Sequence, residues 1–273
     1  MNILIVDGNE EEASQRYTNL GMETQYQVYE KVINKLSNNK FNISTIHPAF
    51  KENYLPQGTS LEDFDGIVWT GSLLNIYDYT PSIINQIELA KELFTKKNKI
   101  FGSCWGLHIL VTAAGGKIRK NPKGLEAVIA KDIQINDIGM SHKMYKDKKK
   151  SFNAFCWHFD ETETLPDNSI VLSSNLMSKV QSISFERDLS SIWAVQYHPE
   201  FDPKWIAGLM NQREEILLKE KSYSSLKDLQ NQKKYFYNYE KLKNKEYAQS
   251  FGDLIDEKKH TLELFNWIES LNN

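Results

Sequence analysis

The stretch Lys99-Ile100-Phe101-Gly102-Ser103-Cys104-Trp105-Gly106 tells more about this chain than any other part of the sequence. Its apolar start predicts a buried strand, and residues 107–114, which follow at once, have the character of a helix. Gly-x-Cys-x-Gly between a strand and a helix is the cysteine form of a nucleophile elbow. The two glycines are expected to let the chain turn sharply and to keep atoms away from the sulfur. A helix N-terminus at the cysteine is expected to favour its thiolate form.

A second motif supports this interpretation, because a small buried cysteine in a plain turn would give the same local pattern. Residues 192–197 form an apolar run that ends in His198-Pro199-Glu200. Residues two apart on an extended chain point to the same side, so Glu200 can orient the imidazole of His198. His198 can then take the proton of the Cys104 thiol. A solvated strand end would explain His-Pro-Glu alone, but the two motifs together predict a catalytic triad of Cys104, His198 and Glu200.

With Val68-Trp69-Thr70-Gly71-Ser72, the two motifs carry a resemblance to a known family. The chain resembles the class I, triad-type glutamine amidotransferases, and most closely the stand-alone amidotransferase domain similar to that of GMP synthase. The resemblance covers residues 1 to about 210. It implies that Cys104 attacks a γ-carboxamide and that ammonia leaves, after which water hydrolyses a γ-glutamyl thioester. His198 would act as general base and then as general acid.

An oxyanion hole in such an enzyme needs two N–H groups directed at the developing charge. One is expected from the backbone of Trp105, directly after the nucleophile, and the other from Ser72 in the Gly71-Ser72 turn. Members of the family often have a second glycine where Ser72 stands. A plain turn at a strand end is the alternative for this segment.

Besides Gly71 of this turn, three further residues are candidates for substrate binding through the resemblance. His158 and Asp160 match the His-x-Asp segment that, in the family, helps to hold the α-amino and α-carboxylate groups of glutamine; a structural role is the alternative. His108 replaces the glutamine that the family commonly has four residues after the cysteine. One helical turn from Cys104, it is expected to line the same pocket and to alter the preference for glutamine. Cys156 lacks the glycines and the helix start, and is expected to be a core residue.

The order of elements predicts an α/β fold with a flavodoxin-like, doubly wound, mainly parallel sheet. Strands are expected at 2–7, 41–46, 65–70 and 99–103, with helices at 26–36 and from Pro81 to about 97, while 9–23 is expected to be a surface loop. Short strands between 126 and 197 predict an antiparallel excursion. The lysine-rich stretch 143–150 is expected to be an exposed loop, with an anion site as the alternative.

The chain is expected to comprise an amidotransferase-like domain over residues 1–210 and a helical C-terminal extension over 211–273 that packs on the same domain. Apolar positions between 262 and 268 favour packing against the sheet, and a partner-binding surface is the alternative.

The composition of the chain excludes several classes of protein. The chain has 273 residues, a formal net charge of −3 and two cysteines. Neither a nucleic-acid partner nor a disulfide framework is expected. No apolar run approaches the length of a membrane helix, and the N-terminus lacks the features of a signal peptide, so a cytoplasmic protein without membrane partners is expected. No cofactor or metal site is predicted, because zinc spacings and phosphate loops are missing from the sequence.

Three functions remain open. The first is a glutaminase that releases ammonia for a separate synthetase subunit, since the chain has no acceptor domain of its own. The second is a stand-alone γ-glutamyl amide or peptide hydrolase, which His108 and the helical tail favour. The third is a non-catalytic binding relative, which the presence of Cys104, His198 and Glu200 disfavours.

Overall fold

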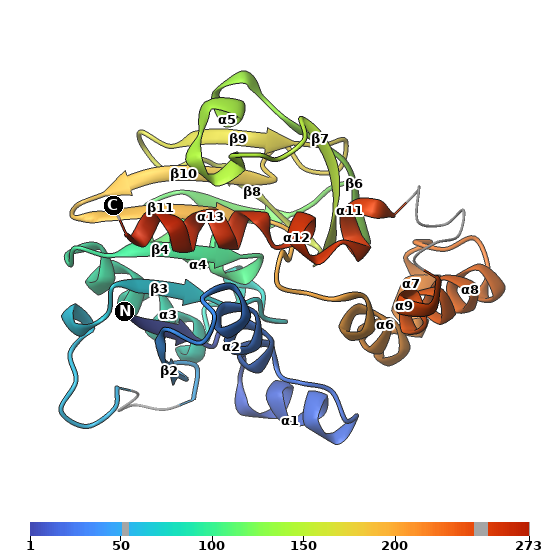
Figure 1. Cartoon of the computed structure of the whole chain (residues 1–273), viewed down its shortest axis with the longest axis horizontal. Helices are drawn as coiled ribbons and strands as arrows, with labels where there is room; N and C mark the ends of the chain where they lie inside the picture. The colour runs from blue at the N-terminus through green and yellow to red at the C-terminus, as the bar shows by residue number, and fades with distance from the viewer. Residues whose placement is uncertain (51–54, 243–250, 273) are drawn as a thin grey trace.

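The computed structural model describes residues 1–50, 55–242 and 251–272. Within these ranges, one nine-stranded sheet has the order β2-β1-β3-β4-β11-β10-β9-β6-β7 (Figure 1). Its strands are β1 (Asn2–Val6), β2 (Asn42–Ile46), β3 (Gly66–Trp69), β4 (Lys99–Ser103), β6 (Glu126–Ile135), β7 (Ser151–His158), β9 (Ile170–Ser174), β10 (Ser182–Arg187) and β11 (Ser190–Val195). Strands β5 (Lys117–Lys120) and β8 (Asp160–Thr164) form a separate antiparallel pair.

The sheet has a parallel and an antiparallel part. Strands β2, β1, β3, β4 and β11 pair in parallel. From β11 onward, β10, β9, β6 and β7 pair antiparallel. The predicted doubly wound α/β fold with an antiparallel excursion is therefore confirmed.

Helices cover both faces of the parallel part. The α-helices are α1 (Glu11–Asn19), α2 (Gln25–Leu36), α3 (Pro81–Phe94), α4 (Trp105–Ala113), α5 (Asp137–Ser141), α6 (Pro203–Gln212), α7 (Glu214–Lys219), α8 (Leu226–Tyr237), α9 (Tyr239–Leu242), α11 (Gly252–Ile255), α12 (Glu257–His260) and α13 (Leu262–Leu271). One apolar core joins α3 and α4 to the sheet, and a second joins α2 and α13 to its other face. Burial on both faces explains why the parallel strands are continuous apolar runs. No helix in the described ranges is both long enough and apolar enough to cross a bilayer.

The expectation of a surface loop over residues 9–23 was wrong. Residues 11–19 form α1, whose Tyr17 is buried, with its ring centroid 5.5 Å from that of Trp205. Most side chains of this helix are polar and face solvent, so its apolar periodicity is too weak to recognise from the sequence.

The prediction of an exposed loop for the lysine-rich stretch 143–150 was only partly correct. Lys148 is buried and forms an ion pair of 2.8 Å with the fully buried Glu263 of α13. Asn266 of the same helix donates to the carbonyl groups of Met144 and Lys146. The stretch therefore anchors α13, which lies along the sheet (Figure 1), and the predicted apolar face of α13 packs on the sheet through Trp267.

Removing the carboxylate of Glu263 tests this anchor. We expect Glu263→Gln to lower the free energy of unfolding by about 3–5 kcal/mol, because Lys148 is left as an unpaired buried cation. Urea unfolding followed by circular dichroism measures the change. Glu88→Gln is the control, because Glu88 pairs with Lys91 on an exposed helix face, where the expected loss is below about 1 kcal/mol. Equal losses in the two variants would contradict the role of the buried pair.

Candidate active site

Cys104 occupies a strained turn between β4 and α4. Its backbone angles are φ 51° and ψ −98°, and a non-glycine residue with positive φ costs about 1–3 kcal/mol. The N–H of Cys104 donates to the carbonyl of Val195, at 2.8 Å, which fixes the turn against the neighbouring strand β11. The expected turn is therefore present, and its strain lies at the cysteine.

The glycines of the elbow serve a different purpose from the one expected. Neither Gly102 nor Gly106 has a positive φ. A Cβ atom on Gly106 would lie 2.7 Å from the carbonyl oxygen of Trp69, and one on Gly102 would lie 2.8 Å from the carbonyl carbon of Gly106. The glycines thus allow α4 to pack closely on β3 and β4, and this packing holds the strained cysteine.

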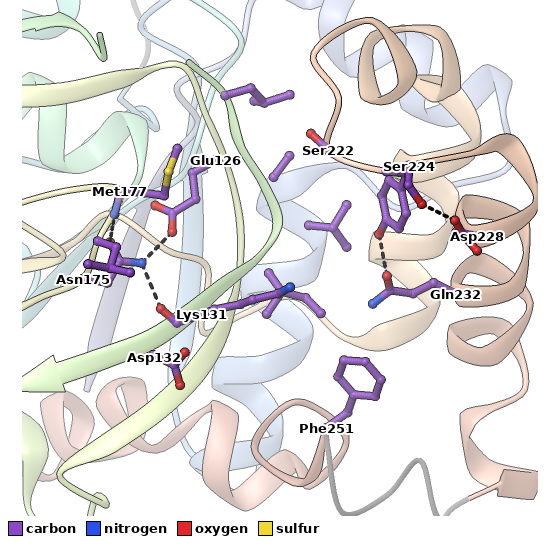
Figure 2. A pocket seen from close by; sticks show the side chains of 16 residues that line it. Glu126, Lys131, Asp132, Asn175, Met177, Ser222, Ser224, Asp228, Gln232 and Phe251 are labelled. Carbon is purple, nitrogen blue, oxygen red and sulfur yellow. Dashed lines mark hydrogen bonds between the residues drawn. The ribbon is translucent and has the colours of Figure 1, made fainter. Parts of the chain in front are cut away.

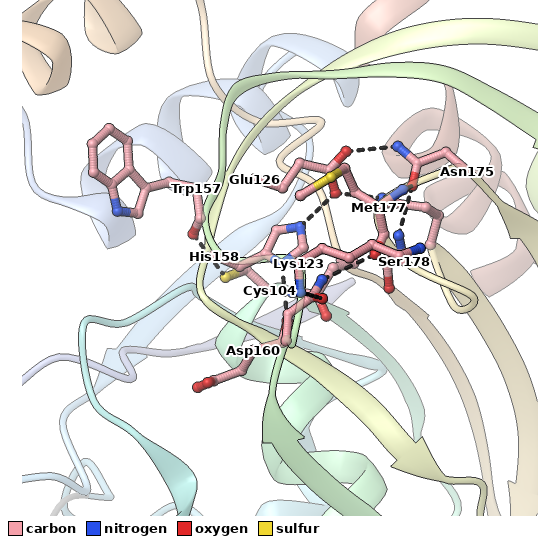
Figure 3. Close-up of polar contacts among 12 residues, drawn as sticks. Cys104, Lys123, Glu126, Trp157, His158, Asp160, Asn175, Met177 and Ser178 are labelled. Carbon is pink, nitrogen blue, oxygen red and sulfur yellow. Dashed lines mark hydrogen bonds and ion pairs between the residues drawn. The ribbon is translucent and has the colours of Figure 1, made fainter. Parts of the chain in front are cut away.

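The sulfur of Cys104 is a thiol at rest. Its Sγ donates to the carbonyl oxygen of Trp157 at 3.5 Å (Figure 3). Burial raises the pKa of the Cys104 thiol, the carboxylates of Glu200 and Asp160 act in the same direction, and a backbone hydrogen bond from Trp105 opposes them. The expectation of a stabilised thiolate is therefore corrected: desolvation outweighs the helix N-terminus, so deprotonation needs a base.

His198 and Glu200 form a buried pair after the end of β11. The Nδ1–H of His198 donates to Oε1 of Glu200 at 2.6 Å. Ser103 Oγ donates to the same oxygen at 3.1 Å, and the hydroxyl of Tyr29 donates to Ser103 at 2.7 Å. The imidazole stacks on Phe201, with ring centroids 4.0 Å apart. These contacts fix the ring in one orientation, and the motifs gave no signal for Tyr29.

Three neighbouring strand ends bring the predicted residues together. In the register of β4 and β11, Ser103 lies opposite Val195, so Cys104 and His198 follow adjacent strand ends. Gly71 follows β3, which pairs with the other side of β4. A Cβ atom on Gly71 would lie 2.7 Å from Cε1 of His198, so this position has no room for a side chain. The arrangement agrees with the rule that open α/β sheets bind ligands beyond the carboxyl ends of their strands.

A pocket of about 170 Å³ opens at the sulfur. It is lined by Ser72, Leu73, Leu74, Asn75, Cys104, His108, Trp157, His158, Phe159, Asp160 and Arg213. Four of the predicted residues thus share the pocket with the cysteine. Arg213 was not singled out, because no motif surrounds it in the sequence.

His108 is a neutral member of the pocket. Its Nε2–H donates to Oε1 of Gln196 at 3.0 Å. Burial lowers the pKa of His108 to about 3, and the nearby His158 acts in the same direction. The imidazole therefore offers polarity without charge.

His158 belongs to a buried network. Its Nδ1 lies 2.8 Å from the carbonyl oxygen of Asp160 and its Nε2 lies 2.9 Å from Oε2 of Glu126 (Figure 3). Asn175 and Gln181 also donate to the Glu126 carboxylate, at 2.6 and 2.8 Å. Burial tends to raise the pKa of Glu126, but the hydrogen bonds from His158, Asn175 and Gln181 lower it overall. Both ring nitrogens of His158 face acceptors, so these two contacts fix the ring, and His158 positions segment 157–160.

Asp160 places a carboxylate at the pocket. Burial raises its pKa, although the hydroxyl of Tyr77, which donates to Oδ1 at 3.2 Å, acts to lower it. Cys156, by contrast, is fully buried in the core of the sheet.

A larger cavity, of about 640 Å³, lies between β6 and α8 and does not include Cys104 (Figure 2). Glu126 and Asn175 line one side of it, and Asp228 and Gln232 line the other. Among the described residues, no group of three or more His, Cys, Asp or Glu side chains could hold a metal ion.

Comparisons with known proteins point to one family. The profile of glutamine amidotransferase class-I matches residues 22–209. The chain is 32% identical over 166 residues to the γ-glutamyl-L-1-hydroxyisopropylamide hydrolase of a Pseudomonas species, covering 60% of this chain and 56% of that enzyme. It is 25% identical over 144 residues to the glutamine-hydrolysing GMP synthase of Petrotoga mobilis, covering 52% of this chain and 25% of the synthase. The matches thus span little more than half of the first relative and a quarter of the second.

The fold also matches a solved structure. A glutamine amidotransferase from Thermotoga maritima superimposes with a TM-score of 0.69 at 14% sequence identity, covering 99% of this chain and 97% of that one. At this identity the match supports the fold.

The reactivity of the two cysteines tests the site. We expect iodoacetamide to label Cys104 before Cys156, because Cys104 lines a pocket whereas Cys156 is fully buried in the core. Since burial raises the pKa of Cys104 above the ordinary thiol value of 9.0, its rate of labelling should still be increasing with pH at pH 9.0. Peptide mapping by mass spectrometry at a series of pH values measures both rates. Labelling of Cys156 first, or a rate that is already constant near pH 7, would contradict this account.

Proposed function

The chain belongs to the class I glutamine amidotransferase family, and from this membership we propose that it hydrolyses γ-glutamyl amides through a Cys104–His198–Glu200 triad. The observation that carries the proposal is the buried His198–Glu200 hydrogen bond, which lies at the strand end adjacent to Cys104 and its pocket. Nucleophile, base and orienting carboxylate are the three parts that such catalysis needs.

The first half of the reaction forms a thioester. His198 takes the proton of the Cys104 thiol, and the sulfur attacks the γ-carbonyl carbon of the substrate. Glu200 stabilises the imidazolium that forms. His198 then returns the proton to the leaving nitrogen, the C–N bond breaks, and ammonia or an amine departs. Because the resting thiol donates to Trp157, it must rotate towards His198 before it reacts.

The second half regenerates the enzyme. Water gives a proton to His198 and attacks the thioester, and the C–S bond breaks to release glutamate and the thiol. In both halves the backbone N–H groups of Ser72 and Trp105 stabilise the oxyanion. This role is supported by the position of Ser72 in the pocket and of Trp105 at the first residue of α4.

The glutamyl group occupies the pocket beside the sulfur. Asp160 accepts hydrogen bonds from the α-ammonium group, and the neutral His108 contacts the amino-acid moiety. The backbone around Gly71, which has no room for a side chain beside His198, forms the wall next to the base. His158 acts by holding segment 157–160 in place.

The leaving group has two alternative fates. Similarity to the γ-glutamyl-L-1-hydroxyisopropylamide hydrolase supports a stand-alone hydrolase whose leaving group is an amine. Similarity to GMP synthase supports delivery of ammonia to a synthetase subunit. The presence of His108 where the family commonly has glutamine favours the hydrolase, and glutamine is then one substrate among several γ-glutamyl amides.

Substitution of each triad residue tests the mechanism. We expect Cys104→Ala to lower glutamate release from γ-glutamyl amides by at least about 10⁴-fold, and His198→Ala to cost nearly as much, because the residues act as a unit. Glu200→Gln should cost roughly 10- to 100-fold less, since Glu200 only orients and stabilises the imidazole. Cys156→Ala is the control and should retain activity. Full activity in Cys104→Ala would reject the triad.

Exchange of His108 tests substrate preference. We expect His108→Gln to shift the ratio of kcat/KM for glutamine to kcat/KM for γ-glutamyl ethylamide by about 10- to 100-fold towards glutamine, as one hydrogen-bonding contact typically does. The rate of iodoacetamide labelling of Cys104 should not change, because the nucleophile and base are untouched. An unchanged ratio would place His108 outside the specificity pocket.

A further inference from the structure

The pocket contains one cation from outside the segment that matches the family. Arg213 lies between α6 and α7, just beyond residue 209, and lines the pocket together with Cys104. It belongs to the helical segment that follows the family match. This segment therefore contributes a side chain to the candidate active site.

The guanidinium of Arg213 lies beside an aromatic ring. Its Cζ lies 5.6 Å from the centroid of the Trp157 ring. Among the described residues, no Asp or Glu forms an ion pair with it, and its buried Nε has no hydrogen-bond partner. Burial lowers the pKa of Arg213; the nearby cation Arg16 acts in the same direction, and Tyr17 opposes it. A buried donor without an acceptor is costly, so this side chain has an unused capacity to bind an anion.

The geometry limits which anion fits. Trp157, whose ring packs against the guanidinium, also provides the carbonyl that accepts from the Cys104 sulfur. A planar guanidinium donates two parallel hydrogen bonds to a carboxylate, and an aromatic face can hold that plane in position. The pocket is small, so an anion bound at Arg213 would belong to the molecule that reacts at Cys104.

We propose that Arg213 is a substrate-binding residue that binds a carboxylate of the γ-glutamyl substrate. The proposal rests on the proposed function for the identity of the substrate. Such a substrate offers two sources of a carboxylate: the α-carboxylate of the glutamyl group, and a carboxylate on the leaving group when that group is an amino acid. Either carboxylate would accept two parallel hydrogen bonds from the guanidinium.

Three substrates distinguish these sources. Arg213→Gln and Arg213→Lys are compared with the wild type on glutamine, γ-glutamyl ethylamide and γ-glutamylglycine. We expect Arg213→Gln to lower kcat/KM by about 10- to 100-fold, mainly through KM, with partial recovery in Arg213→Lys. A loss on all three substrates assigns the α-carboxylate, and a loss confined to γ-glutamylglycine assigns the leaving group. Unchanged kcat/KM values on all three would overturn the proposal.

Arg16→Gln is the matched control. Arg16 contributes a positive charge near Arg213, but it pairs with Glu12 on an exposed helix face and does not line the pocket. Its removal should leave all three kcat/KM values close to those of the wild type. If kcat/KM falls as much in Arg16→Gln as in Arg213→Gln, the loss reflects the positive electrostatic potential around the pocket and not a contact of Arg213. This result would overturn the proposal.

A second measurement does not depend on hydrolysis. Iodoacetate carries a carboxylate and iodoacetamide does not, so the ratio of their rates of Cys104 alkylation reports whether an anion is attracted to the pocket. We expect this ratio to fall several-fold in Arg213→Gln and to stay constant in Arg16→Gln. If the wild type hydrolyses none of the three substrates, the proposed function fails while this ratio still tests Arg213. A ratio in Arg213→Gln equal to that of the wild type would overturn the proposal.

Discussion

The positive φ at Cys104 is the constraint on which the candidate site depends. A cysteine adopts this conformation at a cost of about 1–3 kcal/mol, so the surroundings must enforce it. They do so through the hydrogen bond from Cys104 to Val195 and through the close packing of α4 on Trp69, which Gly106 permits. Strands β3, β4 and β11 lie beside one another in the sheet. The strain is therefore supported by buried parts of β3, β4, β11 and α4, and it directs the sulfur towards the pocket.

Buried polar networks orient the groups around that turn. Glu200 is held by Ser103 and in turn holds His198, while Glu126 pairs with His158 behind the pocket. Charges in such places are stable only when each has a partner. Cys104 differs, because burial and nearby carboxylates keep it a thiol. This difference supports a division of roles in which the cysteine becomes a nucleophile only when a fixed base receives its proton.

The sequence allowed prediction of the features that local patterns encode. The elbow at Cys104 and the apolar runs of the parallel strands were recognised because turn geometry and two-sided burial leave short signatures. Helix α1 was missed because tertiary contact of Tyr17, and not periodicity, stabilises it. The pairing of Lys148 with Glu263 joins residues 115 positions apart, and Arg213 reaches the pocket only through the fold of the helices after β11. Long-range contacts of this kind cannot be predicted from a single sequence.

If different γ-glutamyl amides react through one γ-glutamyl thioester at Cys104, this thioester should partition between two nucleophiles in the same way whatever the leaving group was. The wild type would be incubated with glutamine, and separately with γ-glutamyl ethylamide, at one fixed concentration of hydroxylamine. Hydroxylamine and water compete for the thioester after the leaving group has gone. We expect the same ratio of γ-glutamyl hydroxamate to glutamate from both substrates. A ratio that depends on the leaving group, or glutamate release without any hydroxamate, would contradict it.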